Sequence, residues 1–295
     1  MIGVYLRRRA DFKLLGSTLD ALTARDMAWG WILDPDGKDD PLESDFDRWI
    51  ATGLDQRYAK VLLAVDADYV PRLARPTITI PYFWDNRLAP QPSGRIVCYT
   101  SERHLRTVQR LQSGTPDGPI VGWTEGDAWT LLSRHPQKEA ILYTTKYRNS
   151  ERHWSLADRW WYRQTCQRIA SDYKSRRWAV TIKSREKHRD PSWLRRLGLY
   201  CLDTATYPST SWQLLSRAQE ITHFVSGVAW EAMVAGVPHR SIRVPIGTLV
   251  DYPGRREIEP ALDGTVSREQ FLGDWILPVD GKAGERVADI LARYA

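Results

Sequence analysis

Residues 207–238 read YPSTSWQLLSRAQEITHFVSGVAWEAMVAGVP, and this stretch decides the fold prediction. Its pattern predicts a helix, a strand, a tight Ser226-Gly227 turn and a second helix that carries Glu231 in its first turn and ends at Gly236. A strand that delivers small residues to a helix N-terminus is typical of an anion site, because free backbone N–H groups and the helix dipole converge there. A carboxylate one turn further on can bind a ribose. The stretch therefore predicts a nucleotide diphosphate site, and hence an enzyme that uses an activated donor.

Strands and helices alternate on both sides of this stretch, which predicts an α/β protein with parallel sheets. Strands are expected at 2–6, 28–33, 61–65, 77–83, 95–99, 120–122, 139–144, 177–183, 221–225 and 241–244. Helices are expected at 12–23, 102–111, 156–174, 210–218 and 284–294, with Ser101 and Ser209 as N-caps. A break between 122 and 138 suggests two α/β domains with a cleft between them.

Composition favours a globular protein, since 42% of the 295 residues are hydrophobic and 26% are charged. The longest aliphatic run, 61–65, is far too short to span a bilayer. The N-terminus runs from Met1 straight into a basic triplet, which is the wrong order for a signal peptide, so we expect a cytoplasmic protein. Cys98, Cys166 and Cys201 are far apart, which predicts buried thiols rather than a disulfide or metal framework.

Positive charge is concentrated in one segment of the chain. The net charge is +6, yet residues 146–196 hold fifteen Lys and Arg against five Asp and Glu, together with five tryptophans. Basic side chains mixed with aromatic rings suggest an anionic partner. The alternative is a solvated helix face with long basic side chains.

Five short motifs resemble, in the same order, those of the CDP-glycerol glycerophosphotransferase-like proteins. They are VGWTEGD at 121–127, ILYTTKYR at 141–148, VTIK at 180–183, the stretch 207–238 and DGKAGER at 280–286. That family belongs to the GT-B group of nucleotide-sugar glycosyltransferases, which also includes UDP-sugar 2-epimerases and phage enzymes that glycosylate DNA. The resemblance implies a GT-B architecture with two Rossmann-like domains, 1–125 and 126–280, the second of which mainly holds the donor. It also implies a closing helix at 281–295 that packs back toward the first domain.

The sequence departs from the family at one place that bears on the reaction. Family members carry a His-Gly pair just after a strand of the first domain, and that histidine is thought to be catalytic. Here the matching segment, 84–87, reads Trp-Asp-Asn-Arg and has no histidine nearby. This absence argues against glycerophosphate transfer. Asp85 is the candidate general base for a sugar transfer, which needs a group to take the acceptor's proton; the alternative is a turn aspartate that caps nearby N–H groups.

The remaining candidate residues lie at expected strand ends and helix starts. Arg148 and Lys183 follow second-domain strands, where ligands bind in open α/β sheets, and are expected to hold the diphosphate. The further donor-binding candidates are Thr210, Ser226, Gly227 and Glu231, for which plain capping or a solvated helix face is the alternative. The acceptor-binding candidates are Arg7, Arg8, Arg9 and Trp84, for which an exposed loop is the alternative.

These observations predict a glycosyltransferase that moves a sugar from a nucleotide-sugar donor to a hydroxyl on an anionic acceptor. A UDP-sugar is the favoured donor, and no metal site or cofactor is expected. The acceptor candidates are a hydroxymethylated base, as in phage-type DNA modification, and an anionic envelope polymer. Two alternatives stay open: a CDP-polyol phosphotransferase, and a non-catalytic nucleic-acid-binding protein on a transferase scaffold.

Overall fold

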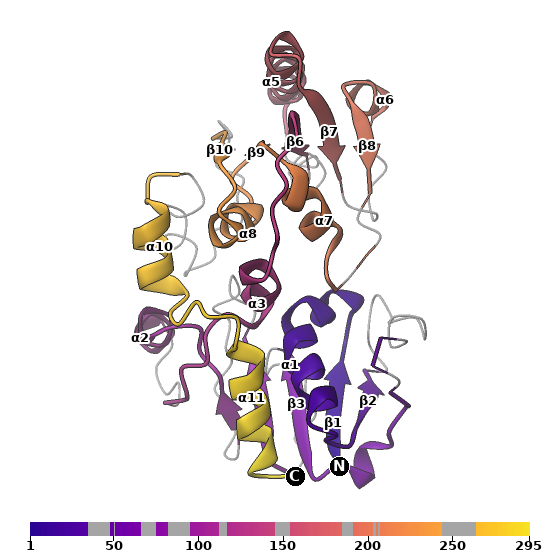
Figure 1. Cartoon of the computed structure of the whole chain (residues 1–295), viewed down its shortest axis with the longest axis vertical. Coiled ribbons are helices and arrows are strands. Elements are labelled where there is room, and N and C mark those ends of the chain that lie inside the picture. The colour runs from indigo at the N-terminus through magenta and orange to yellow at the C-terminus, as the bar shows by residue number, and fades with distance from the viewer. Residues whose placement is uncertain are drawn as a thin grey trace. The chain divides into compact units, whose positions relative to one another are not determined.

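The computed structural model describes residues 1–34, 48–49, 51–65, 75–81, 95–111, 117–144, 154–184, 191–202, 205, 207–243 and 264–295. These residues form two compact units. The first lies within Met1–Leu131 and Leu272–Ala295, and the second consists of described residues between 132 and 271. Each unit contains one five-stranded parallel sheet with helices packed on it (Figure 1). The predicted α/β class with two Rossmann-like units is therefore confirmed.

The first sheet has the strand order β2-β1-β3-β4-β5, and all its pairings are parallel. Its strands are β1 (Ile2–Leu6), β2 (Trp29–Leu33), β3 (Val61–Val65), β4 (Thr77–Ile80) and β5 (Arg95–Val97). The helical elements of this unit are η1 (Arg9–Asp11), α1 (Phe12–Ala24), η3 (Gln56–Tyr58), α2 (Glu102–Leu111), α3 (Thr124–Thr130) and α11 (Ala283–Ala292).

Apolar runs account for these elements. Every residue of β1 and β3 is buried, as expected for central strands covered on both faces. Along α1, Phe12, Leu15 and Leu19 recur at helical spacing and are fully buried. Ser101 caps α2 as predicted, because its Oγ accepts the backbone N–H of His104 at 3.1 Å.

Two of the sequence motifs meet at the start of the last helix. The carboxylate of Asp127, on α3, accepts the backbone N–H groups of Ala283 at 3.1 Å and Gly284 at 2.7 Å. Arg286 donates to the carbonyl of Val121 at 3.1 Å. Helices α1, α3 and α11 pack against one another here. The motifs at 121–127 and 280–286 thus contact each other, and Asp127 caps the N-terminus of α11, which begins 156 residues later in the chain.

The second sheet has the order β10-β9-β6-β7-β8 and is also wholly parallel. Its strands are β6 (Glu139–Tyr143), β7 (Ala179–Lys183), β8 (Leu199–Cys201), β9 (Glu220–His223) and β10 (His239–Ser241). Its helices are α5 (Leu156–Ser175), α6 (Ser192–Arg195), α7 (Thr210–Arg217) and α8 (Val228–Ala235). A further helix, α10 (Arg268–Trp275), begins in the second unit and ends in the first.

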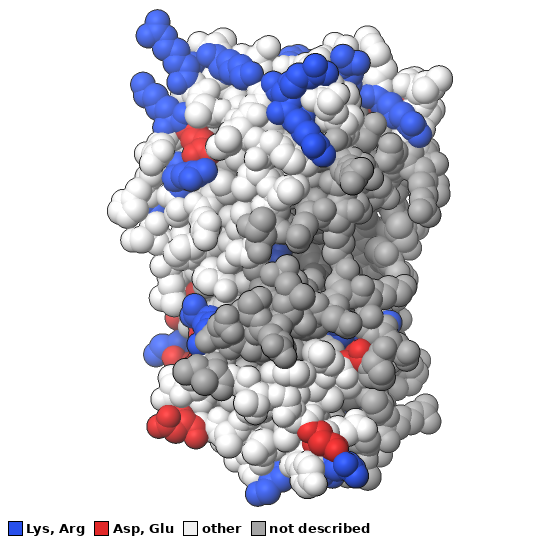
Figure 2. All heavy atoms as spheres, turned by 90° about the vertical axis from the view of Figure 1, so that its right-hand side faces the viewer, with Lys and Arg blue, Asp and Glu red and all other residues white. Residues whose placement is uncertain are grey.

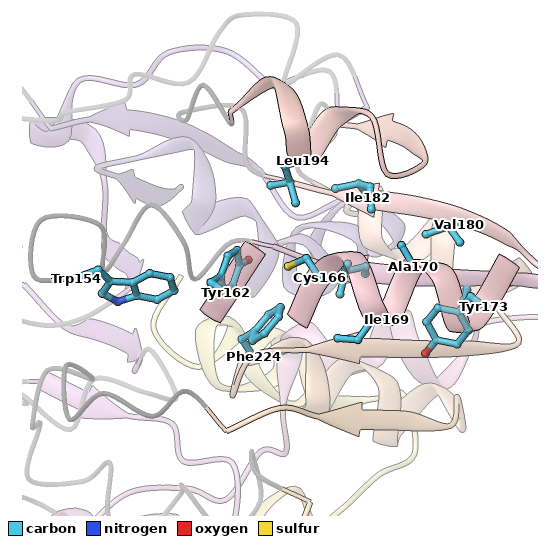
Figure 3. Close-up of a cluster of buried hydrophobic side chains, with 12 residues drawn as sticks. Trp154, Tyr162, Cys166, Ile169, Ala170, Tyr173, Val180, Ile182, Leu194 and Phe224 are labelled. Carbon is cyan, nitrogen blue, oxygen red and sulfur yellow. The ribbon is translucent and has the colours of Figure 1, made fainter. Parts of the chain in front are cut away.

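Helix α5 forms the core of the second unit with one face of the sheet. Its predicted stripe of Tyr162, Cys166, Ile169 and Tyr173 is buried and faces the strands (Figure 3). The two tyrosines also use their hydroxyls: Tyr162 donates to the carbonyl of Thr144 at 3.2 Å, and Tyr173 donates to Glu220 at 2.9 Å. The burial of apolar side chains and the hydrogen bonds of the two tyrosine hydroxyls together hold α5 on the sheet.

Some expectations from the sequence are wrong in detail. Residues 120–122 form only an isolated bridge between Ile120 and Tyr99, not a strand. Ser209 precedes α7, but its side chain makes no capping hydrogen bond. Helices α3, α6 and α10 and strand β8 were not expected. Within the described ranges, no helix is long and apolar enough to cross a membrane.

Candidate functional site

The carboxyl edge of the second sheet collects polar side chains on a single level. Lys183 ends β7 and pairs in register with Tyr143 of β6, which in turn pairs with His223 of β9. Paired positions of parallel strands point to the same face, and neighbouring strands lie about 4.8 Å apart. All three side chains are buried. An amine, a phenol and an imidazole therefore lie side by side at the edge where ligands bind in open α/β sheets.

In the turn between β9 and α8, one of the two backbone N–H groups expected to bind a phosphate is already hydrogen-bonded within the protein. The backbone N–H of Ser226 donates to Nδ1 of His223 at 3.2 Å. Among the described residues, the backbone N–H groups of Gly227 and Val228 have no partner. At the other end, Gly236 stops α8 as predicted, with the left-handed φ of 67° that favours glycine. The free donors at this helix start are thus those of Gly227 and Val228, one residue later than expected.

A pair of histidines that was not predicted from the sequence supports this turn. Nε2 of His223 lies 3.2 Å from Nδ1 of His239, and the rings stack with centroids 5.4 Å apart. Because Nδ1 of His223 accepts from Ser226, a neutral ring carries its proton on Nε2 and donates it to His239. Burial, with a smaller contribution from the charge of His239, lowers the pKa of His223 to about 3. Burial also lowers the pKa of His239.

Lys183 is 2% exposed, which is rare for a lysine. Its Nζ donates to the carbonyl of Ser184 at 2.9 Å, so the ammonium is held at the end of β7. A cation in this place is suited to bind a phosphate as a point charge.

The start of α7 and the first turn of α8 supply the other donor-side candidates. Thr210 is buried, and its Oγ1 accepts the backbone N–H of Ala205 at 2.9 Å. Ser209 Oγ, also buried, has no hydrogen-bond partner in the described part of the chain. Glu231 lies half-buried in the first turn of α8, as predicted. The chain thus offers hydroxyl, carboxylate and N–H groups from two helix starts of one unit.

In the first unit, the predicted acceptor-side arginines contact carboxylates. Arg8 Nε donates to Asp11 at 2.9 Å, and Arg7 Nε lies 3.7 Å from Asp34. Asp11 also accepts the backbone N–H groups of both arginines. Burial raises the pKa of Asp11, while the charge and hydrogen bonds of Arg8 oppose that rise. These groups follow β1 and β2, whose carboxyl ends are neighbours in the sheet.

Several predicted residues lie outside the described part of the chain, namely Asp85, Trp84 and Arg148, and the side chain of Arg9 is likewise not described. Their roles stay predictions, as does the interdomain cleft. Within the described ranges, no group of three or more His, Cys, Asp or Glu residues could hold a metal ion.

No protein-family model and no curated protein matched the sequence. Solved structures matched along nearly the whole chain. The UDP-GlcNAc 2-epimerase of Methanocaldococcus jannaschii, solved with UDP-GlcNAc and UDP, is 14% identical, with a TM-score of 0.56 and 99% of each chain covered. The wall teichoic acid polymerase TagF, solved with CDPG, is 10% identical, with a TM-score of 0.55 over 99% of this chain and 88% of that one.

A third match is the spinosyn rhamnosyltransferase SpnG, solved with thymidine diphosphate. It is 13% identical, with a TM-score of 0.50 over 99% of this chain and 96% of that one. At these identities the likeness establishes the fold alone. The chain therefore has the GT-B fold of nucleotide-sugar transferases and related epimerases, as the motifs predicted.

Proposed function

We propose that this protein is a glycosyltransferase that takes a sugar from a nucleotide donor, favoured to be a UDP-sugar, and transfers it to a hydroxyl on an anionic acceptor. The observation that carries the proposal lies at the carboxyl edge of the second sheet. There the free N–H groups of Gly227 and Val228 follow β9 and the buried Lys183 ends β7, with β6 between these two strands. N–H groups at a helix start bind phosphate well, and a cation neutralises the departing diphosphate. The structural neighbours were solved with UDP or thymidine diphosphate, which supports this choice of ligand.

Replacing Lys183 with methionine is expected to weaken UDP binding by at least tenfold. Hydrogen bonds to charged groups contribute about 1.5–3 kcal/mol, which corresponds to roughly 10–150-fold in Kd. Methionine keeps most of the apolar stem, so the fold should survive. Isothermal titration with UDP measures the effect, and circular dichroism checks the fold. The matched control is Lys174→Met on the exposed side of α5, which should leave binding unchanged. Unchanged UDP affinity in folded Lys183→Met would remove this lysine from the site.

A second candidate reaction is polyol-phosphate transfer from a CDP-linked donor, which the likeness to TagF favours. A thermal-shift panel of UDP-, GDP-, CDP- and dTDP-sugars with CDP-glycerol separates the two reactions. Stabilisation by UDP-sugars supports sugar transfer, and a response to CDP-glycerol alone supports the second candidate. If no compound raises the melting temperature, both transferase proposals fail. If a UDP-sugar does stabilise the protein, product analysis with that UDP-sugar and no acceptor distinguishes sugar transfer from epimerisation of the donor sugar.

Asp85 is proposed as the general base for the acceptor hydroxyl. A positioned base contributes about 10²–10⁴-fold to the rate, so Asp85→Asn should lower kcat by that factor. UDP affinity should stay unchanged, because the base contacts the acceptor and not the nucleotide. Single-turnover assays with a saturating donor measure the step. A normal rate in the variant would assign the base to another residue, with Asp34 as the next candidate.

A further inference from the structure

Exposed cationic side chains surround α5 and α6, and we call this surface the α5–α6 basic face. It consists of Arg163, Arg168, Lys174, Arg176, Arg177, Arg195 and Arg196. Figure 2 shows Lys and Arg side chains gathered over the part of the second unit that carries α5 and α6, with little acidic surface among them in this view. Helix α5 has 20 residues and so extends for about 30 Å. The positively charged surface therefore extends along the helix rather than being concentrated at a single point.

The two acidic residues of α5 are already engaged. Asp158 completes the capping box of α5 with Ser155, and Asp172 forms an ion pair with Arg176 at 2.7 Å. Lys183 is buried and does not contribute to the surface. The remaining cations thus present a net positive field, which attracts polyanions at moderate ionic strength.

Aromatic rings hold three of the arginines in place. The guanidinium of Arg163 lies over Trp193 at 5.9 Å, that of Arg176 over Trp178 at 5.8 Å, and that of Arg195 over Tyr200 at 5.2 Å from the ring centroids. A stacked guanidinium keeps its N–H donors at its edge, where they can bind a phosphate bidentately. Because these side chains are ordered in advance, a ligand loses less conformational entropy on binding them.

One large ring on this surface remains open to solvent. Trp160 is 65% exposed and lies three residues before Arg163 on α5. An unpaired nucleic-acid base can stack on such a ring while its phosphates contact the neighbouring arginine. A membrane would instead need a broad apolar face. The only large apolar neighbour of Trp160 among the exposed residues of α5 is Leu156, and the helix continues with Gln164, Arg168 and Lys174.

We propose that the α5–α6 basic face binds single-stranded nucleic acid, with phosphates on the arginines and a base stacked on Trp160. The reading in which the bound strand is the sugar acceptor rests on the proposed transferase function and names its acceptor class. The binding of nucleic acid itself is argued from the surface residues alone. An exposed ring favours a single strand over a duplex, because paired bases offer no free face for stacking.

Fluorescence anisotropy with a labelled single-stranded oligonucleotide of mixed sequence tests the proposal. Each phosphate contact contributes about 0.7 to the slope of log K against log salt for single strands. The triple variant Arg163→Gln, Arg195→Gln, Arg196→Gln should therefore lower the slope by about 2. Trp160→Ala should weaken binding by about tenfold and leave the slope unchanged. A duplex of the same sequence should bind more weakly and be insensitive to Trp160→Ala.

The matched control removes the same charge from exposed positions of the first unit: Lys60→Gln, Arg106→Gln, Arg293→Gln. It should bind the oligonucleotide like the parent protein. Equal losses in both triple variants, no salt-dependent binding, or binding only to vesicles that contain phosphatidylserine would each overturn the proposal. Titration with UDP separates the two proposals. Oligonucleotide binding without UDP binding would defeat the transferase and leave this inference standing, whereas UDP binding without oligonucleotide binding would do the reverse.

Discussion

Replacing Gly284 with alanine is expected to lower the free energy of unfolding of the first unit by about 2–3 kcal/mol. Gly284 lies in the first turn of α11, against α1. An alanine Cβ there would lie 2.4 Å from the carbonyl carbon of Ser17 and 2.6 Å from its carbonyl oxygen. Backbone atoms cannot rotate away as a side chain does, so α1 and α11 must separate. Overpacking of this kind costs typically about 1–3 kcal/mol, occasionally more, and outweighs the gain in helix propensity.

Gly273→Ala is the matched control, and its effect should have the opposite sign. Gly273 is exposed inside α10, and an added Cβ would meet no atom within 4 Å. The better helix propensity of alanine should raise the free energy of unfolding by up to about 1 kcal/mol. Urea unfolding followed by tryptophan fluorescence measures both variants. If Gly284→Ala left the free energy of unfolding unchanged or raised it, the close approach of α11 to α1 would be disproved.

The sequence predicted the sheets and main helices because their patterns are local. Runs such as 61–65 are aliphatic throughout, and the stripe from Tyr162 to Tyr173 repeats at helical spacing, so each pattern can be recognised without knowing its neighbours. Helix α3 was missed because Thr124–Thr130 is short and has no such stripe. Strand β8 has only three residues at a sheet edge, where little burial is available to leave a pattern.

The site was predicted less completely, because its contacts arise from strand pairing. His223 and His239 are 16 residues apart and were treated as single residues. Parallel pairing of β9 with β10 brings their rings together, and no spacing rule within the chain signals it. The same applies to Asp127, whose partners in α11 lie more than 150 residues away. A histidine three residues before a strand-to-helix turn was the only available signal, since its ring can reach the turn's N–H groups.

The free energy of unfolding is expected to fall by about 2 kcal/mol for each of two buried histidines between pH 7.5 and pH 5. Burial lowers the pKa of His104, in the first unit, to about 4, and that of His223 to about 3. Both rings accept a backbone N–H at Nδ1, from Thr100 and Ser226 respectively, each at 3.2 Å. In the unfolded chain both rings titrate near pH 6.5. The unfolded state therefore binds more protons below that pH, and stability is lost as the pH falls from 6.5 toward each lowered pKa.

The size of this loss at pH 5 depends on the unfolded pKa, because both folded rings are still neutral there. Each pH unit below 6.5 costs about 1.4 kcal/mol per histidine. Asp11 and Asp127, whose pKa values burial raises, act in the opposite sense at lower pH, which is why the comparison ends at pH 5. His104→Asn and His223→Asn keep an acceptor near Nδ1 but remove the titration of that ring, so each should reduce the pH dependence of its own unit. In the second unit His239, whose pKa burial also lowers, retains part of that dependence. A free energy of unfolding that stayed constant from pH 7.5 to 5 would mean that these rings gain protons in the folded protein, and the hydrogen bond from Ser226 that orders the start of α8 would then be lost with them.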